Sequence, residues 1–352
     1  MDSNTVMMLM WATIVVVLIF DFTNGFHDAS NITGSIIASR AMTPIQAALL
    51  TGVFHFIGPM LGGVAVANTI GGFVKIDDLP KVMSLTVVLC GIFGSIFWNL
   101  LTWFFGLPSS SSHALVGGIA GAVLFAAGGD HVVWGVEKLV VDGKMTGVTK
   151  VVLSLFISPI LGFWLGYMLQ VLVRRLTNRA RPSIDKVFKW SQYISAAALS
   201  FSHGTNDAQK SMGIIGLALF LGGEIPKFGI PYWVIVTCAV VITIGNMFGG
   251  WRIVRTVGFG IYRVRPIHSF NAQLTSAAVI FGAATMGAPV STTHVASSGI
   301  MGVGSADRPK AVKWRKGKEI LATWLLTIPG SGLVGGATYL LTDLIFHVSA
   351  GR

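Results

Sequence analysis

Apolar segments recur along the whole chain, and this feature restricts the fold more than any other. A helix needs roughly 20 apolar residues to cross the hydrocarbon core of a bilayer. Segments that meet this requirement or come close to it are 44–68, 82–105, 148–173, 232–251, 269–286 and 319–343. Only 11% of the residues are charged, against about a quarter in ordinary soluble domains. The sequence therefore predicts an all-α polytopic membrane protein that contacts lipid and lies in the cell (inner or plasma) membrane.

Basic residues are concentrated in short segments between the apolar ones. The formal net charge is +11, and the excess lies in 174–189, 252–265 and 308–318. Short loops rich in Lys and Arg are retained in the cytoplasm. We therefore interpret the positive charge as a sign of membrane topology and expect no nucleic-acid partner. Segment 174–189 is predicted to be a basic cytoplasmic linker.

The second half of the chain repeats the first. Segments of the two halves match in the same order: 25–29 ("GFHDA") with 204–208 ("GTNDA"), 58–71 with 245–258, and 106–121 ("GLPSSSSHALVGGIAG") with 287–302 ("GAPVSTTHVASSGIMG"). Chance similarity among glycine-rich apolar segments is the alternative, and the conserved order argues against it. We predict a first repeat over 1–173 and a second repeat over 190–352, joined by the linker.

Equivalent loops of the two halves differ in charge. Loop 71–81 has no net charge, whereas its counterpart 252–265 carries four Arg and no acid. Loop 130–144 carries two Lys and three acids, whereas 307–319 carries six basic residues and two acids. Equivalent loops are therefore predicted to lie on opposite sides of the membrane, which requires an odd number of crossings per repeat. We predict two inverted-topology repeats of about five crossings each, with both termini outside, a design typical of secondary transporters.

The predicted crossings divide equally between the two repeats. Those of the first repeat are 7–39, 44–69, 82–105, 108–128 and 148–173, and those of the second are 190–222, 232–251, 269–287, 289–305 and 319–345. The sequence leaves open whether 108–128 and 289–305 cross the membrane fully or re-enter on the same side.

The first crossing of each repeat carries polar and ionisable residues at its middle. These are Asn24, His27, Asp28 and Asn31 in the first copy and His203, Asn206, Asp207 and Lys210 in the second. Ionisable groups at this depth usually mark an ion or substrate pathway, and carboxylate and amide oxygens are ligands of hard cations. We expect interrupted helices here, unwound at the midplane around a cavity. The alternative is that the two Asp side chains cap helices or pair with Lys210 and Arg40.

A second duplicated motif places hydroxyl groups at predicted helix starts. It reads "PSSSSH" at 108–113 and "PVSTTH" at 289–294. Proline suits the first helical turn, and the unpaired N–H groups of a helix N-terminus bind anions. The two copies, facing each other, are predicted to hold a tetrahedral oxyanion between them. His113 and His294 are either structural histidines or proton carriers.

Together the duplicated segments "GFHDASN", "GTNDAQK", "PSSSSH" and "PVSTTH" resemble the inorganic phosphate transporter (PiT) family over the whole chain. The resemblance implies a low-affinity, bacterial-type phosphate permease, a symporter that imports inorganic phosphate with H⁺ or Na⁺ by alternating access. It implies a substrate site formed by Asp28, Asn31, Ser110, Ser111, Ser112, Asn206, Asp207, Ser291, Thr292 and Thr293. The cation-coupling residues are expected to be Asn24, His27, Asp28, His203, Asn206 and Asp207, with Lys210, His113 and His294 in a second rank.

The first motif departs from the family pattern, because His27 stands where many members have Asn. Histidine titrates near neutral pH and Asn does not, so the coupling ion stays open, with protons favoured over Na⁺. The resemblance also implies that a divalent metal can travel with phosphate as a complex, and that a branch of the family carries sulfate. The sequence is compatible with a homodimer without deciding it.

Two other classes of function are compatible with the same motifs. Paired interrupted helices also occur in channels, so an anion channel is one alternative. A membrane-embedded hydrolase that uses Asp28 and Asp207 is another. The chain has no Walker motif and no zinc-ligand spacing, so we expect no enzyme activity, no cofactor and no resident metal.

Overall fold

The computed structural model describes residues 3–248 and 260–351. Its long helices are α1 (Ser3–Ala38), α2 (Pro44–Leu61), α4 (Lys81–Phe104), α5 (Ser111–Ala127), α7 (Gly147–Leu176), α8 (Ile184–Gly222), α9 (Tyr232–Phe248), α11 (Pro266–Thr285), α12 (Thr292–Asp307) and α13 (Trp314–Phe346). Shorter helices are α3 (Ala65–Gly71), α6 (Val136–Asp142), η1 (Gly129–His131), η3 (Pro309–Ala311) and η4 (Val348–Gly351). The described residues contain an isolated β-bridge and no strand, so the predicted all-α fold is confirmed.

Several helices have the length and composition of membrane spans. Of the described helices, α1, α2, α4, α7 and α13 are long and apolar enough to cross a bilayer. Helix α8 is the longest, with 39 residues, but its polar centre lowers its hydropathy. The predicted crossing 44–69 is divided between α2 and α3, which are separated at Gly62 and Gly63. A multi-pass membrane protein is therefore confirmed, although single spans differ from their predicted ranges.

Helices α1 and α8 run without interruption through the polar motifs, so the predicted unwinding at 24–31 and 203–210 is wrong. Neither motif contains proline, and a helical glycine is less favourable than alanine by only about 1 kcal/mol. Unwinding in a low-dielectric interior would instead leave several backbone groups without partners. The polar side chains are carried on intact helices and buried among protein atoms.

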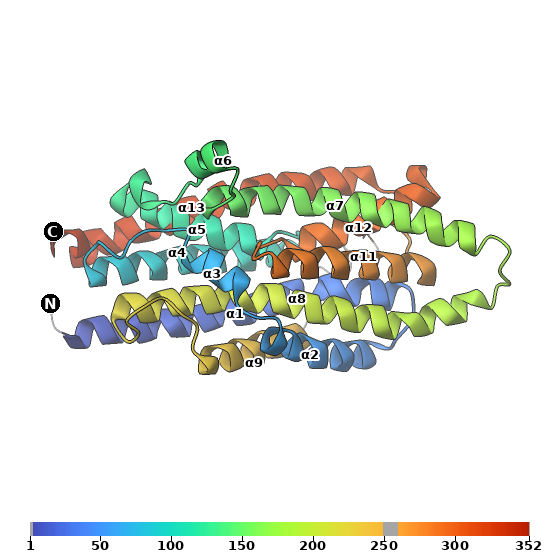
Figure 1. The fold of residues 1–352 in the computed structure, drawn as a ribbon, viewed down its shortest axis with the longest axis horizontal. Coiled ribbons are helices and arrows are strands. Elements are labelled where there is room, and N and C mark those ends of the chain that lie inside the picture. The colour runs from blue at the N-terminus through green and yellow to red at the C-terminus, as the bar shows by residue number, and fades with distance from the viewer. Residues whose placement is uncertain (1–2, 249–259, 352) are drawn as a thin grey trace.

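The ends of the long helices define two ends of the molecule (Figure 1). Both chain ends lie at one end, α6 lies in the same half of the molecule, and the α7–α8 connection lies at the other end. This arrangement agrees with an odd number of crossings between the first terminus and the basic linker. The predicted repeat segment 245–258 and the basic loop 252–265 lie largely outside the described residues.

Two helical hairpins point towards the centre from opposite ends. Helices α4 and α5 lie in the half that holds the chain ends, and α11 and α12 lie in the other half (Figure 1). Gly106 and Gly287 form the two turns, with φ angles of 65° and 64°, a backbone region that favours glycine. Helices α5 and α12 begin after these turns and have 17 and 16 residues, about 25 Å at the usual rise. The fourth predicted crossing of each half is therefore a short helix that starts at the centre.

Glycines allow α1 and α8 to pack closely against the other half of the chain. A Cβ atom on Gly25 of α1 would lie 2.3 Å from Ile242 O of α9. A Cβ atom on Gly204 of α8 would lie 2.3 Å from His55 O of α2. The same close approach occurs at two further pairs, Gly58 with Phe201 and Gly245 with Phe22. The packing of α1 on α9 thus matches the packing of α8 on α2.

Replacing Gly204 with Ala is expected to destabilise the fold by about 1–3 kcal/mol, because the new methyl group would overlap the backbone of α2. The midpoint of thermal unfolding in detergent measures this effect. Gly282→Ala on α11 is the matched control, since nothing lies within 4 Å of its added Cβ. Equal midpoints for the two variants would contradict the close packing.

Candidate functional site

The two hairpin turns meet the polar centres of α1 and α8 inside the molecule. Asp28 of α1 is 1% exposed and accepts hydrogen bonds from both hairpins. Ser111 Oγ of α5 donates to Asp28 Oδ2 at 3.0 Å, and Thr293 Oγ1 of α12 donates to Asp28 Oδ1 at 3.1 Å. Asn31 Nδ2 donates in turn to Thr293 Oγ1 at 2.8 Å. One carboxylate therefore connects the starts of both short helices.

Asp207 of α8 occupies an equivalent place and has a different partner. Lys210 Nζ lies 2.5 Å from Asp207 Oδ1, and both side chains are fully buried. His203 Nδ1 lies 3.3 Å from Asp207 Oδ2. Of the two pairings that the sequence left open, the one between Asp207 and Lys210 is therefore present. Lys210, predicted in the second rank, thus lies at the centre in direct contact with Asp207.

Thr292 lies between the two carboxylates. Its Oγ1 is 3.4 Å from Asp28 Oδ2 and 3.4 Å from Asp207 Oδ2. Ligand atoms of Asp28, His203 and Asp207 all lie within 4.8 Å of one another. Two carboxylates beside a single lysine leave an excess of negative charge when the histidines are neutral. This part of the site is suited to a cation.

The turn of the second hairpin is held from two sides. Asn206 Nδ2 donates to Ala288 O at 3.2 Å, and Val290 N donates to Asn206 Oδ1 at 3.3 Å. Val290 O accepts from Ser112 Oγ at 2.9 Å and from Lys210 Nζ at 3.2 Å. Asn206 and Ser112 thus position the segment from which α12 begins.

Ser110 and Ser291 cap the two short helices. Ser110 Oγ accepts from His113 N, and Ser291 Oγ accepts from His294 N, both at 3.2 Å. Each cap satisfies one of the four N–H groups that a helix start leaves without an intrahelical partner. The remaining first-turn N–H groups of a helix start favour an anion. Neutral donors and two carboxylates therefore lie side by side.

His27 and Asn24 precede Asp28 on helix α1. His27 Nδ1 lies 2.6 Å from Asp28 Oδ1, and His27 Nε2 lies 3.3 Å from Ser109 Oγ. Asn24 is fully buried, and its amide atoms have no hydrogen-bond partner among the described residues. His27 therefore touches the central carboxylate directly, whereas Asn24, one turn earlier on α1, makes no hydrogen bond to it.

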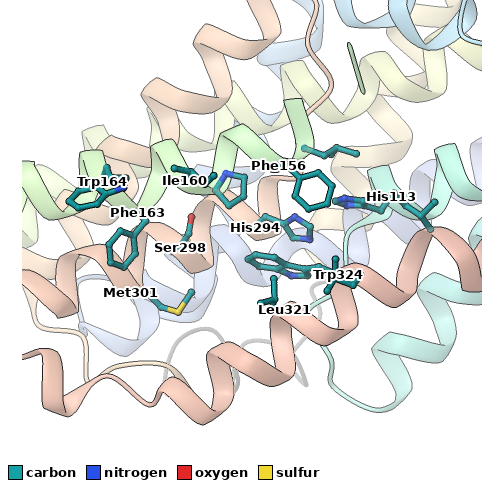
Figure 2. A pocket seen from close by; sticks show the side chains of 14 residues that line it. His113, Phe156, Ile160, Phe163, Trp164, His294, Ser298, Met301, Leu321 and Trp324 are labelled. Carbon is teal, nitrogen blue, oxygen red and sulfur yellow. The ribbon is translucent and has the colours of Figure 1, made fainter. Parts of the chain in front are cut away.

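His113 and His294 lie together, away from the carboxylates. Their ring centroids are 4.7 Å apart, and the His294 ring stacks on Trp324 at 3.7 Å. Figure 2 shows both rings at a cavity of about 400 Å³ whose lining is mainly apolar, including Phe156 and Leu321. No hydrogen bond to Asp28 or Asp207 is present. The two histidines form a pair of their own and do not complete the central site.

Sequence reasoning missed two buried groups at the centre. Asp21 accepts a hydrogen bond from Ser211 Oγ at 2.6 Å, and so links α1 to α8. His55 of α2 lies against His203, with ring centroids 5.1 Å apart. A single ionisable residue inside the predicted crossing 44–69 was the signal for His55. Asp21 gave no repeat signal, because its counterpart is Ser200.

Comparisons with known proteins agree on one class. Residues 24–335 match the Phosphate transporter family. A probable low-affinity inorganic phosphate transporter of Rhizobium meliloti (strain 1021) is 39% identical over 98% of this chain and 100% of its own length. A protein of Bacillus subtilis (strain 168) with the same description is 40% identical, over 95% of this chain and 97% of its own length. A solved structure described as the sodium-dependent phosphate transporter superposes with a TM-score of 0.78 at 25% identity, covering 96% of this chain and 100% of that one.

Proposed function

Because the chain belongs to the phosphate transporter family, we propose that it imports inorganic phosphate by secondary active symport. One observation supports this proposal most directly. The N-terminal ends of α5 and α12, which are rich in Ser and Thr, contact the buried carboxylates of Asp28 and Asp207. Helix N-termini bind anions, and carboxylates bind cations. A site that holds both ions next to each other makes the binding of each dependent on the other.

The residues divide between the two ions by their chemistry. The substrate site consists of Asp28, Asn31, Ser110, Ser111, Ser112, Asn206, Asp207, Ser291, Thr292 and Thr293. The coupling site consists of Asn24, His27, Asp28, His203, Asn206 and Asp207. The carboxylates belong to both sets because they lie between the anion donors and the imidazole rings. Hydroxyl and amide donors hold the anion without a full countercharge, so that it can leave again.

We propose that the two halves are inverted-topology repeats that alternate in opening the site. Reciprocal packing supports this proposal: α13 packs on α5 as α7 packs on α12. The glycine contacts of α1 with α9 and of α8 with α2 are likewise equivalent. Each hairpin closes the site from its own end, so moving one hairpin at a time would expose the site to one side at a time.

Protons are the coupling ion that the contacts favour. Each carboxylate has an imidazole within 3.3 Å, His27 at Asp28 and His203 at Asp207, and histidine exchanges protons near neutral pH. Sodium is the second candidate, since the superposed structure is described as sodium-dependent. A divalent metal carried with phosphate is an alternative form of the cargo, supported by the cluster of Asp28, His203 and Asp207.

Uptake of labelled phosphate into proteoliposomes, with pH and Na⁺ gradients imposed separately, tests this function. Accumulation against a phosphate gradient, driven by an inward proton gradient, is the expected result. Accumulation driven by Na⁺ at equal pH would assign the coupling to sodium. Equilibration without accumulation would indicate a channel, and preference for labelled sulfate would indicate a sulfate permease.

Replacing His27 with Asn is expected to weaken the pH dependence of uptake while phosphate binding persists. An imidazole side chain can take up and release a proton, whereas an amide at the same place only donates or accepts a hydrogen bond. The measurement is the initial uptake rate between pH 5 and 8, the range in which histidine titrates. His131, which is partly buried and lies outside the site beside Asp78, is changed to Asn as the control. An unaltered pH profile for His27→Asn would exclude His27 from coupling.

The topology is expected to place both termini outside the cell. Single cysteines at Lys75 and Val140 are then accessible to a membrane-impermeant thiol reagent added from outside. Cysteines at Arg181 and Arg315 react only after the cells are permeabilised, because these residues lie in basic segments. The native Cys90 and Cys238 are buried. The reverse labelling pattern would contradict the proposed orientation.

A further inference from the structure

A polar cavity lies beside the turn of the second hairpin. It has a volume of about 420 Å³ and is lined by α3, the segment 145–150 and the turn 285–287. Its polar side chains are Asn68, Thr69, Thr146, Lys150 and Thr285. Helix α3 lies in the half of the molecule that holds the chain ends (Figure 1). The cavity is therefore on the side of the central site that faces the termini.

Lys150 is a cation without a carboxylate partner among the described residues. Its Nζ donates to Thr69 Oγ1 at 3.2 Å, and no described Asp or Glu forms an ion pair with it. An ammonium group has three N–H donors, and the described part of the chain accounts for one of them. A lysine with unused donors in a polar cavity is suited to bind an anion.

A short segment of chain separates this cavity from the central site. Thr69 Oγ1 donates to Gly287 O at 2.7 Å, at the cavity. Three residues further on, Val290 O accepts from Lys210, the partner of Asp207. The turn 287–290 is therefore the barrier between the polar cavity and the buried carboxylates. An anion bound at Lys150 would lie next to the turn of the α11–α12 hairpin. In the proposed cycle this hairpin moves to open the central site.

We propose that this cavity is a recruitment site at which Lys150 binds inorganic phosphate before it reaches the central site. The proposal rests on phosphate transport as the proposed function and adds a second anion site to it. A single positive charge in a cleft raises the local concentration of anions and the rate of their capture. Lysine acts there as a point charge, so the site captures oxyanions without selecting among them. Selection is left to the central site.

The first test measures phosphate uptake from the outside as a function of concentration. Lys150→Gln is expected to raise the KM by about fivefold, because the local attraction for the anion is lost. The maximal rate should stay within about twofold, since the central site is unchanged. Lys150→Arg keeps the charge and should restore the KM. Lys144→Gln is the control, because Lys144 lies in the exposed loop before α7 and outside the cavity lining.

The second test measures anion binding without transport. Met145 lines the cavity and is 45% exposed, so Met145→Cys introduces a reactive thiol there. Phosphate should slow its modification by a maleimide, whereas chloride at the same ionic strength should not. Adding Lys150→Gln to this variant should remove the protection, and adding Lys150→Arg should keep it.

The outcomes separate the recruitment site from the proposed function. An unchanged KM for Lys150→Gln in an active transporter, or protection that persists in Met145→Cys/Lys150→Gln, would overturn the recruitment site alone. Wild-type protein that fails to take up phosphate would overturn the proposed function, and the thiol protection would still decide whether the cavity binds phosphate. If Lys150→Gln lowers the unfolding midpoint in detergent and Lys150→Arg does not restore the KM, Lys150 is a structural clamp on Thr69 and the proposal fails.

Discussion

Replacing Asp28 with Asn is expected to reduce phosphate uptake by about tenfold or more and to narrow the preference for phosphate over sulfate. Both anions are tetrahedral, so hydroxyl groups and helix starts accept either one. At neutral pH phosphate still carries a proton that a carboxylate can accept, and sulfate does not. Sites built around one hydrogen bond discriminate strongly, because the wrong ligand leaves buried polar groups unpaired. Sulfate would also face a bare negative charge at low dielectric.

The contacts indicate which carboxylate accepts the phosphate proton. Asp207 is already paired with the ammonium of Lys210 at 2.5 Å. Asp28 instead accepts from the hydroxyl groups of Ser111 and Thr293, at the starts of both short helices. A phosphate bound at those helix starts would lie next to Asp28. We therefore expect Asp28 to contact the substrate and Asp207 chiefly to hold the cation.

Initial uptake rates and competition by sulfate measure this effect. Asp207→Asn should reduce uptake as well, but should leave the ratio of phosphate to sulfate affinity close to that of the wild type. Asp130→Asn, which changes an exposed carboxylate, is the control. If Asp28→Asn and Asp207→Asn both abolish transport and neither binds sulfate better, the carboxylates serve the cation alone. The account of selectivity would then be wrong.

Replacing Lys210 with Gln is expected to destabilise the protein by about 3–5 kcal/mol, because Asp207 would remain as a buried charge without its partner. Lys210 Nζ also donates to Val290 O at 3.2 Å, so the turn of the second hairpin would lose a support. Uptake should be abolished. The double variant Lys210→Gln/Asp207→Asn leaves no unpaired charge, and its stability should recover while uptake does not.

An exposed ion pair of the same geometry provides the control. Lys316 Nζ lies 2.5 Å from Glu319 Oε2, three residues apart as in the central pair, with the side chains 48% and 40% exposed. Exposed pairs contribute about 0–1 kcal/mol, so Lys316→Gln should leave the unfolding midpoint in detergent nearly unchanged. A double variant at the centre that is no more stable than Lys210→Gln would show that the loss does not come from the unpaired Asp207.

The sequence alone determined the class of fold and predicted most of the residues that the structure brings together at the centre. Apolar segments separated by basic loops leave few alternatives to a helical membrane protein. The duplicated motifs identified Asp28, Asp207 and the hydroxyl groups at the starts of α5 and α12, all of which meet at the centre. The sequence points to these residues because a charge or a cluster of hydroxyl groups in an apolar span is unfavourable unless it has a function.

Only the tertiary structure decided how the backbone carries these groups and which of them touch. The polar motifs lie on continuous helices, because protein atoms from other helices surround them and intrahelical bonds satisfy the backbone. The contact of His55 with His203 and the bond between Asp21 and Ser211 join different helices. Sequence spacing predicts neighbours on one helix, but it carries no information on which helices come together. The pairing of Lys210 with Asp207 is local, yet its burial depends on the hairpins that close over it.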